Sequence, residues 1–276
     1  MEIWDGHCHI SGFSGTPAER VGKSLEVADR MGVDKLCIYM GTSFHTEPTA
    51  EQLIEANDQV LEAVAAWPDR VFGWVYLSPA HLETSLAELE RCVANGPMVA
   101  IKLWVAQNCD TPEADAIVKR ATELKAPVFQ HTWRKITGNL PLDVVHRDEE
   151  VMLPGTFEYM AVDLVRLAQR HPDATLICGH TGGDWELGIR AIRPIKNLYA
   201  DLGGGDPTAG FTEMAVRELG AERILFGSDI PGRSFGSQIA KVEGARISET
   251  EKSLIYSQNL KRLLAPILEL KGVAVG

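Results

Sequence analysis

The sequence lacks the long apolar run that a membrane-spanning helix requires. No uninterrupted hydrophobic stretch among the 276 residues approaches the roughly 18 that such a helix needs. The opening segment, MEIWDGHCHI, has no basic stretch followed by an apolar one. The 5 cysteines show no CxxC spacing, and a chain of this length can build a core without disulfides. We therefore expect a cytoplasmic protein that does not associate with membranes.

Basic charge is also scarce. The 27 lysines and arginines are outnumbered by 38 acidic residues, which leaves a net charge of −11. This balance disfavours non-specific binding to nucleic acid or to anionic membranes. No GxGxxG motif follows the first apolar run, as a dinucleotide-binding sheet would usually show. The expected partner is a small-molecule substrate, and the sequence leaves open whether the chain forms a homo-oligomer.

Short β-branched or apolar runs recur eight times along the chain. They are IWDGH near residue 3, KLCIYM near 35, VFGWVYL near 71, VAIKL near 99, PVFQH near 127, TLICGH near 175, NLYADL near 197 and RILFGSD near 223. Each is expected to form a strand. Segments with helical spacing and helix start or stop signals lie between them: Pro17–Met31, Pro48–Trp67, Leu82–Ala94, Pro112–Lys125, Phe157–Arg170, Asp184–Ile192 and Thr208–Leu219.

This alternation predicts a single (β/α)8 TIM barrel spanning residues 1–276, with an appended C-terminal helix at Glu249–Leu264. A doubly wound open sheet would alternate in the same way, but the number and spacing of the repeats favour the barrel. No linker marks a domain boundary. The stretch Thr132–Thr156 is too long for a plain connection and is expected to lie over the barrel mouth.

Four of the 8 histidines fall at the ends of predicted strands. His7 and His9 end the first, His131 the fifth and His180 the sixth. Because the carboxyl ends of all barrel strands meet at one face, these side chains are expected to converge there. Strand periodicity places His7 and His9 on one side of the strand, and Asp5 shares their parity.

Two further polar residues join this face. Asp229 ends the eighth strand in FGSDIPG, and Lys102 ends the fourth in AIKLW. Converging imidazoles and a carboxylate suit Zn²⁺, with Mn²⁺ or Fe²⁺ as competitors. Singly, a strand-end histidine is more often a hydrogen-bonded core residue, Asp229 could be a turn residue and Lys102 a surface lysine. Their joint placement on five strands favours a metal site.

The ordered motifs DGHCHI, AIKLW, QHTW, CGHTGG and FGSDIPG, together with the closing segment IYSQNLKRLL, resemble the amidohydrolase superfamily. The resemblance is to its amidohydrolase-related branch of TIM-barrel metal-dependent hydrolases. It implies that His7, His9 and Asp229 bind a divalent metal. It also implies that His131 completes the ligand set or contacts a second ion.

The resemblance leaves two residues with alternative roles. His180 would act on the substrate carbonyl in a site with one ion, or bind the second ion in a site with two. Lys102 would be carboxylated and bridge both ions, as in two-metal members of the superfamily, although many one-metal members of the branch have no lysine there.

Hydrolysis of a C–N or C–O bond, in an amide, lactone or ester, is the main functional expectation. A bound divalent ion lowers the pKa of water to about 7. Asp229 would take the proton of that water and return it to the leaving group, while His180 would stabilise the oxyanion. Arg233 and Arg134 suggest an anionic substrate, and Trp104 could line its pocket.

Two other functions stay open. The same family branch includes metal-dependent decarboxylases and hydratases of unsaturated or aromatic carboxylic acids, as well as lactonases, and these share the ligand set. A decarboxylase would suit the cationic loop residues equally well. A non-catalytic binding barrel with structural histidines is the alternative from another class.

Overall fold

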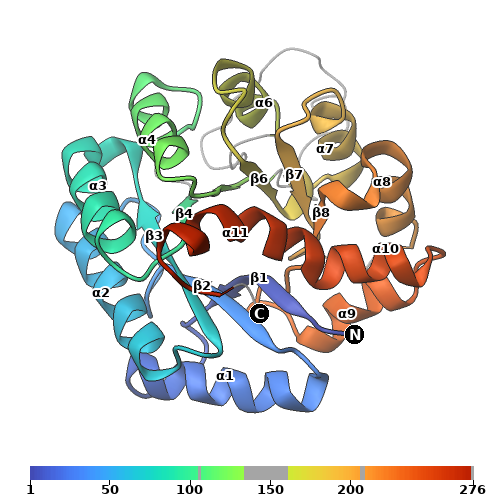
Figure 1. The fold of residues 1–276 in the computed structure, drawn as a ribbon, viewed down its shortest axis with the longest axis horizontal. Helices are drawn as coiled ribbons and strands as arrows, with labels where there is room; N and C mark the ends of the chain where they lie inside the picture. The colour runs from blue at the N-terminus through green and yellow to red at the C-terminus, as the bar shows by residue number, and fades with distance from the viewer. Residues whose placement is uncertain (105–106, 134–160, 206–208, 275–276) are drawn as a thin grey trace, which may run out of the picture.

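The computed structural model describes residues 1–104, 107–133, 161–205 and 209–274. Within them, eight parallel strands form one sheet that follows the order of the chain. The strands are β1 (Trp4–His9), β2 (Lys35–Tyr39), β3 (Val71–Leu77), β4 (Ala100–Leu103), β5 (Val128–His131), β6 (Leu176–Gly179), β7 (Leu198–Asp201) and β8 (Ile224–Leu225). Figure 1 shows helices surrounding these strands, which confirms the predicted (β/α)8 barrel.

The barrel closes between β1 and the segment that follows β8. Three backbone hydrogen bonds join them: Gly6 N to Phe226 O at 3.0 Å, His9 N to Ile230 O at 2.8 Å and Asp229 N to His7 O at 2.7 Å. The strand predicted in RILFGSD is shorter than expected, since only Ile224–Leu225 has regular strand structure. The closing bonds nevertheless bring the eighth strand end directly against the first.

Helices lie in the connections between the strands, and three more follow β8. They are α1 (Pro17–Met31), α2 (Ala50–Ala66), α3 (Leu82–Glu88), α4 (Pro112–Glu123), α6 (Ala161–Arg170), α7 (Trp185–Ile192), α8 (Phe211–Leu219), α9 (Phe235–Glu243), α10 (Glu249–Ser253) and α11 (Asn259–Leu270). Local signals set their ends. At the start of α1, Thr16 and Glu19 form a reciprocal capping box, and Gly32 ends the helix in the left-handed region at φ 71°.

Helix positions agree closely with the sequence, with a few differences. Helix α3 continues as a π-helical turn, Leu89–Ala94, so the predicted Leu82–Ala94 has two parts. Helix α9 was not predicted as a separate element. The predicted closing helix divides into α10, a π-helical turn and α11, and extends to Leu270. Most of Thr132–Thr156 lies outside the described residues. Among the described helices, none has the length and hydropathy needed to cross a bilayer.

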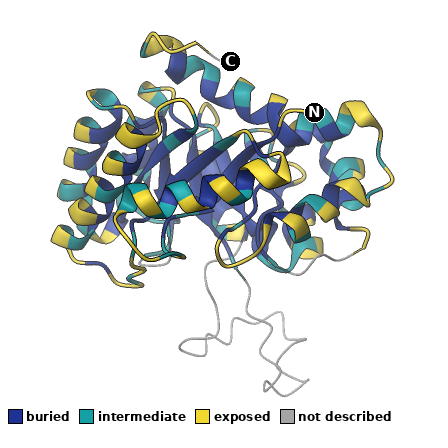
Figure 2. Cartoon of the chain, turned by 90° about the horizontal axis from the view of Figure 1, so that it is seen from below, coloured by how far each residue is buried: buried dark blue, intermediate teal, exposed yellow. Residues whose placement is uncertain are grey.

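Helix α11 covers the end of the barrel opposite the carboxyl ends of the strands. Figure 1 shows it crossing the ring of strands. Lys271, just after α11, donates to the carbonyl of Gly96 ahead of β4 at 2.7 Å. At the other end of the helix, the buried Asn259 amide donates to the carbonyls of Ala221 and Ile224 at 2.7 and 2.8 Å. Figure 2 shows that the strands enclosed by the helices are buried. The open face of the barrel is thus the one formed by the carboxyl ends of the strands.

We expect Asn259→Ala to lower the free energy of unfolding by about 2 kcal/mol or more, because two buried carbonyls next to β8 lose their donor. Gln258→Ala, at the neighbouring exposed position, should change stability by less than about 0.5 kcal/mol. Urea unfolding followed by circular dichroism measures both variants. Equal midpoints for the two variants would contradict the anchoring role of Asn259.

Candidate metal centre

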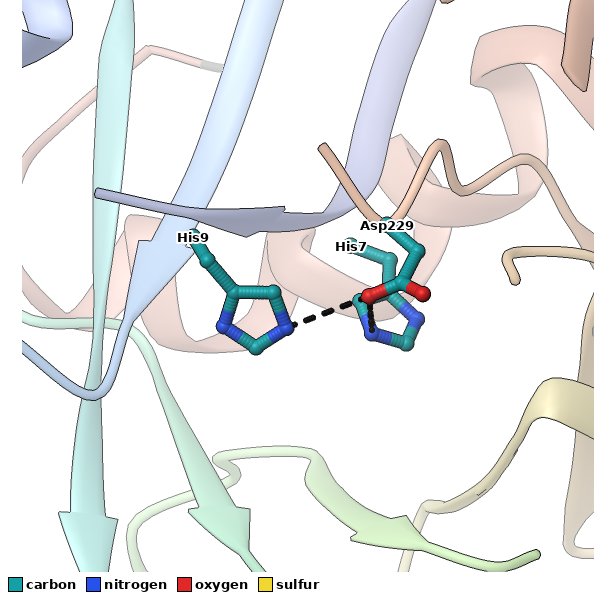
Figure 3. A group of neighbouring side chains, drawn as sticks. All are labelled: His7, His9 and Asp229. Carbon is teal, nitrogen blue, oxygen red and sulfur yellow. Dashed lines mark ion pairs between the residues drawn. The ribbon is translucent and has the colours of Figure 1, made fainter. Parts of the chain in front are cut away.

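His7 and His9 project from β1 toward Asp229. The Nε2 atoms of both imidazoles lie 3.3 Å from Asp229 Oδ1, and Figure 3 shows the two rings on either side of that oxygen. Asp229 is held in place by its backbone, which donates to the His7 carbonyl and has a positive φ of 58°. The closure of the barrel therefore brings together residues of the first strand and of the segment after the last strand.

Asp5 does not join this group. A register shift between Asp5 and Cys8 interrupts the alternation of β1, so the predicted shared parity of Asp5 with His7 is wrong. The Asp5 carboxylate instead accepts from the backbone N–H groups of His7 and Ser228, both at 2.9 Å. Its role is to fix the backbone on both sides of the barrel closure.

The His7, His9 and Asp229 group fits a divalent ion. These three residues offer ligand atoms within 4.8 Å of one another. Bonds of about 2.0 to 2.2 Å to a tetrahedral ion place two ligand atoms about 3.3 to 3.6 Å apart, and both His–Asp separations are 3.3 Å. Within the described part of the chain, His7 Nε2 is buried without a hydrogen-bond partner. A nitrogen, nitrogen and oxygen donor set suits Zn²⁺, Mn²⁺ or Fe²⁺.

Asp201, at the end of β7, orients His7 from behind. Its Oδ2 atom lies 2.6 Å from His7 Nδ1, and both side chains are almost fully buried. This bond places the proton of a neutral His7 on Nδ1, so that Nε2 offers its lone pair to an ion. Sequence reasoning missed Asp201, although its position at a strand end in NLYADL was a signal of the same kind as that of Asp229.

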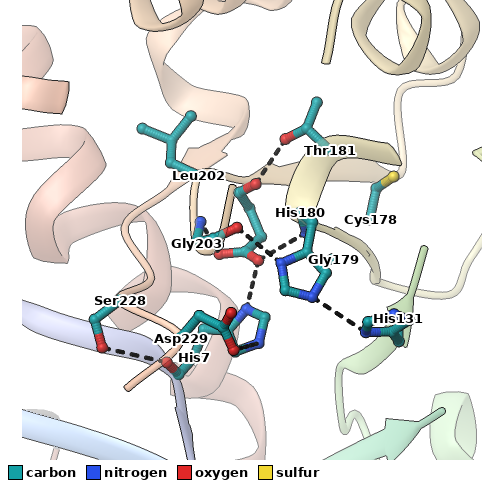
Figure 4. Close-up of polar contacts among 12 residues, drawn as sticks. His7, His131, Cys178, Gly179, His180, Thr181, Leu202, Gly203, Ser228 and Asp229 are labelled. Carbon is teal, nitrogen blue, oxygen red and sulfur yellow. Dashed lines mark hydrogen bonds and ion pairs between the residues drawn. The ribbon is translucent and has the colours of Figure 1, made fainter. Parts of the chain in front are cut away.

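His180 and His131 form a second imidazole pair beside the first. His180 Nδ1 lies 2.9 Å from the Gly203 carbonyl, and its Nε2 lies 3.1 Å from His131 Nδ1. The His180 backbone N–H donates to Asp201 at 2.9 Å. Figure 4 shows His180 between His131 and Gly203, with its contacts to both drawn as dashed lines. Because a carbonyl only accepts, Nδ1 of His180 carries a proton and Nε2 of the neutral ring accepts.

A second group of ligand atoms consists of His7, His180 and Asp201. Three atoms of this group already have close partners: His7 Nδ1 and Asp201 Oδ2 lie 2.6 Å apart, and His180 Nδ1 donates to the Gly203 carbonyl. The geometry therefore fits a hydrogen-bonded support better than a second ion.

Electrostatics divide the imidazoles into one cation and three neutral rings. Burial alone would lower the pKa of His7, but Asp201 and Asp229 outweigh it and raise that pKa to about 9. Burial lowers the pKa of His9 to about 4 and holds those of His131 and His180 well below the usual range. Without an ion, protonated His7 thus balances the carboxylates, and a bound cation would replace its proton.

The Asp229 carboxylate stays ionised. Burial would raise its pKa, but the contacts of Oδ1 with the imidazoles of His7 and His9 outweigh burial and hold the pKa far below its usual range. The ionised carboxylate is the form that binds a divalent cation.

Lys102 lies in the barrel interior. It is fully buried, and its amine stands 3.9 Å from the centre of the Phe129 ring and 4.5 Å from that of Tyr39. Among the described residues, the amine has no hydrogen-bond partner. Burial lowers its pKa to about 7. The proposed carboxylation and metal bridging by Lys102 stay predictions.

A cavity of about 230 Å³ adjoins the centre. Its walls come from strand ends and the loops after them: His9, Met40, Phe44, Trp104, His131, Trp133, His180, Asp229 and Arg233. The predicted substrate-binding residues Arg233 and Trp104 thus reach it, whereas Arg134 lies outside the described residues. A larger groove of about 540 Å³ lies along α1, and its lining includes no histidine. The smaller cavity is therefore the candidate substrate site.

Comparisons with known proteins agree with this architecture. The family model described as Amidohydrolase matches residues 4–265. A gamma-resorcylate decarboxylase of Polaromonas sp. strain JS666 is 27% identical over 250 residues, covering 75% of each chain.

Two solved structures share the fold. A 2,6-dihydroxybenzoate decarboxylase complexed with 2,6-dihydroxybenzoate gives a TM-score of 0.73 at 18% identity, covering 95% of this chain and 99% of the other. A dihydroxybenzoic acid decarboxylase of Polaromonas sp. JS666, with bound manganese and 2-nitroresorcinol, gives 0.69 at 20% identity, covering 96% and 98%. With the family model matching almost its whole length, the chain belongs to the amidohydrolase family.

Proposed function

We propose that the chain is a divalent-metal-dependent decarboxylase of a small aromatic carboxylic acid. The observation that carries this proposal is the aromatic cavity of about 230 Å³ beside His9 and Asp229. Two relatives that match 75% and 87% of the chain give further support, because both are named as gamma-resorcylate decarboxylases. This favours the alternative that the sequence left open over hydrolysis of a C–N or C–O bond.

The walls of the cavity suit one planar ring. The Phe44 ring lies 4.8 Å from that of His9 and 5.7 Å from that of Trp104. The Trp133 ring stands edge-on to His180 at 5.0 Å. A cavity lined by aromatic rings favours a flat aromatic molecule through burial and ring contacts.

Arg233 supplies a cation at the rim. It is exposed, and its guanidinium donates to the neighbouring Gly232 carbonyl at 2.8 Å. The remaining N–H groups are sufficient to bind a carboxylate or a phenolic oxygen of a substrate. In an otherwise acidic protein, this residue favours an anionic molecule at the mouth of the cavity.

The chemistry requires one proton at the ring carbon that bears the carboxylate. The ion held by His7, His9 and Asp229 would supply positive charge that binds and polarises oxygen atoms of the substrate. We assign proton transfer to Asp229: its ionised carboxylate would take up a proton from solvent on Oδ2, the oxygen that does not face the two imidazoles, and pass it to the ring carbon. Ring electrons form the new C–H bond. The C–C bond then breaks, its electron pair restores the aromatic ring, and CO2 leaves.

His180 has a positioning role in this scheme. The N–H group at Nδ1 donates a hydrogen bond to the Gly203 carbonyl. The Nε2 atom of the neutral ring can therefore accept a hydrogen bond but cannot donate one. This differs from the expected role of His180 as a donor to an oxyanion. It suits instead a fixed wall beside His131.

The first test is the reaction itself. With Mn²⁺ or Zn²⁺ supplied, the purified protein should release CO2 from 2,6-dihydroxybenzoate or another hydroxylated benzoic acid. Product analysis by liquid chromatography and CO2 detection measures this. Hydrolysis of lactones, esters or amides in a parallel panel, with no CO2 from any aromatic acid, would replace the proposal with the hydrolase function. An absence of turnover throughout would favour the binding barrel.

Metal affinity provides a second test that needs no substrate. His9→Ala should weaken Mn²⁺ binding at least about a hundredfold, because it removes a ligand rather than a supporting group. His81→Ala is the control, since His81 bonds to the Pro48 carbonyl away from the centre. Equilibrium dialysis with metal analysis gives both affinities. Equal affinities in the two variants would exclude this centre.

The same measurement has an expected pH dependence. The pKa of His7 is raised to about 9, so the free site holds a proton below that pH, and binding must release it. The apparent affinity should therefore rise about tenfold per pH unit between pH 6 and 8 and level off above pH 9. A flat profile would contradict proton displacement from His7.

Asp229→Asn tests proton delivery. An amide oxygen can still face an ion but cannot carry the proton, so turnover should fall by about 10² to 10⁴. The exposed Asp173→Asn serves as a charge-matched control and should keep full activity. Steady-state CO2 release measures the effect, and metal content confirms occupancy. Wild-type turnover in a metal-loaded Asp229→Asn protein would show that Asp229 does not transfer the proton.

A further inference from the structure

Lys241 is a buried lysine outside the candidate centre. It lies on α9, only 7% exposed, and its ammonium stands 5.5 Å from the centre of the Phe211 ring. The ammonium donates to the carbonyl of Leu202 at 2.8 Å and to that of Gly204. Both carbonyls belong to the loop that follows β7. Lys241 therefore ties this loop to the helix that follows the Asp229 segment.

The Gly203 carbonyl, which lies between those of Leu202 and Gly204 in the chain, faces His180 and not Lys241. Gly203 O accepts the Nδ1 proton of His180 at 2.9 Å, and Gly203 N donates to Asp201 at 2.9 Å. The fit is close, because a Cβ added at Gly204 would lie 2.2 Å from His180 Nδ1. A small rotation of these peptides would therefore displace the acceptor from His180.

We propose that Lys241 is a positioning residue that sets the proton arrangement of the His180 and His131 pair. By holding the Leu202 and Gly204 carbonyls, it keeps the Gly203 carbonyl pointed at His180. His180 is then protonated on Nδ1, and its Nε2 accepts from His131 Nδ1 at 3.1 Å. Only the kinetic part of the test below rests on the proposed function.

The chemistry of lysine suits this task. An ammonium group has three donors and no acceptor, so it can hold two carbonyls at once without competing for the loop's N–H groups. An apolar side chain of similar length would leave both carbonyls buried and unpaired, and the loop would gain by rotating them toward other donors. The Gly203 peptide would rotate with them, and His180 would lose the acceptor that selects its tautomer.

The test is the tautomer of His180 in the full-length protein loaded with Zn²⁺, which is diamagnetic. Two-bond ¹H–¹⁵N NMR of the imidazoles distinguishes a ring protonated on Nδ1 from one protonated on Nε2, and a His180→Gln spectrum assigns the signal. We expect the Nδ1 form in the wild type and a mixture of both forms in Lys241→Met. Lys241→Arg restores donors to the carbonyls and should keep the Nδ1 form.

Lys252→Met is the matched control. Lys252 is 8% exposed, but its ammonium pairs with Glu243 and Glu249 at 3.0 and 2.9 Å, and not with the loop. In the Lys252→Met variant, the tautomer of His180 should remain that of the wild type. An unchanged tautomer in folded Lys241→Met, or an equal change in Lys252→Met, would overturn the proposal. If Lys241→Met does not fold, Lys241→Gln, which can reach one carbonyl, takes its place in the comparison.

A kinetic measurement separates positioning from general destabilisation. With 2,6-dihydroxybenzoate as substrate, kcat of Lys241→Met should fall at least tenfold, because His180 no longer holds the His131 ring in place by accepting its Nδ1 proton. KM should change less than twofold, because the side chains that line the cavity are unchanged. Lys252→Met should keep the wild-type kcat. If no variant, including the wild type, decarboxylates this acid, the decarboxylase proposal fails for that substrate, and the NMR comparison still decides the role of Lys241.

Discussion

The hydrogen bond between His7 and Asp201 is the interaction on which the site depends. Asp201 is buried, and its carboxylate would be costly to bury without partners. Three contacts satisfy it: His7 Nδ1 at 2.6 Å, the backbone N–H of His180 at 2.9 Å and that of Gly203 at 2.9 Å. One carboxylate thus fixes β1, the turn after β6 and the loop after β7 relative to one another. The free Nε2 of His7 takes its direction from this arrangement.

The filled interior of the barrel confines the chemistry to its rim. Below the histidines, the rings of Tyr39, Trp74 and Phe129 pack with centroids 5.6 to 5.8 Å apart. The Lys102 amine rests against two of them, where the ring faces offset part of the cost of burying its charge. In the described part of the chain, α11 lies across the other end of the barrel, and the cavity that reaches the imidazoles opens at the carboxyl ends of the strands. The cavity lies there, so ligand access and ion binding occur on the same face.

Much of this arrangement was predictable from the sequence, because topology alone brings strand ends together. His7, His131, His180 and Asp229 each follow or end an apolar run, and eight such runs predict a closed ring. Knowledge of the strand ends was therefore enough to gather these side chains. The candidate metal centre could be predicted from the strand ends and from the alternation that places His7 and His9 on one side of their strand.

The errors have local physical causes. The prediction that Asp5 lies on the same side of the strand as His7 was wrong because β1 contains a register shift, which the residue pattern does not reveal. Asp201 was overlooked because a single strand-end aspartate has no nearby motif to single it out. The contacts of the loop after β7 with His180 and Lys241 are made by its backbone carbonyls, which are the same in every sequence. Hydrogen bonds made by the backbone leave little trace in residue types.

The choice of reaction is set by features less regular than strand ends. The same ion ligands serve water activation in a hydrolase and carboxylate binding in a decarboxylase, since both need a Lewis acid beside an ionised aspartate. What differs is the shape in front of the ion, and here that shape comes from Phe44, Trp104 and Trp133, which follow strand ends. Under the proposed function, this wall would hold a planar acid beside Asp229. The shape of the cavity, rather than the ion ligands, would then select the bond that reacts.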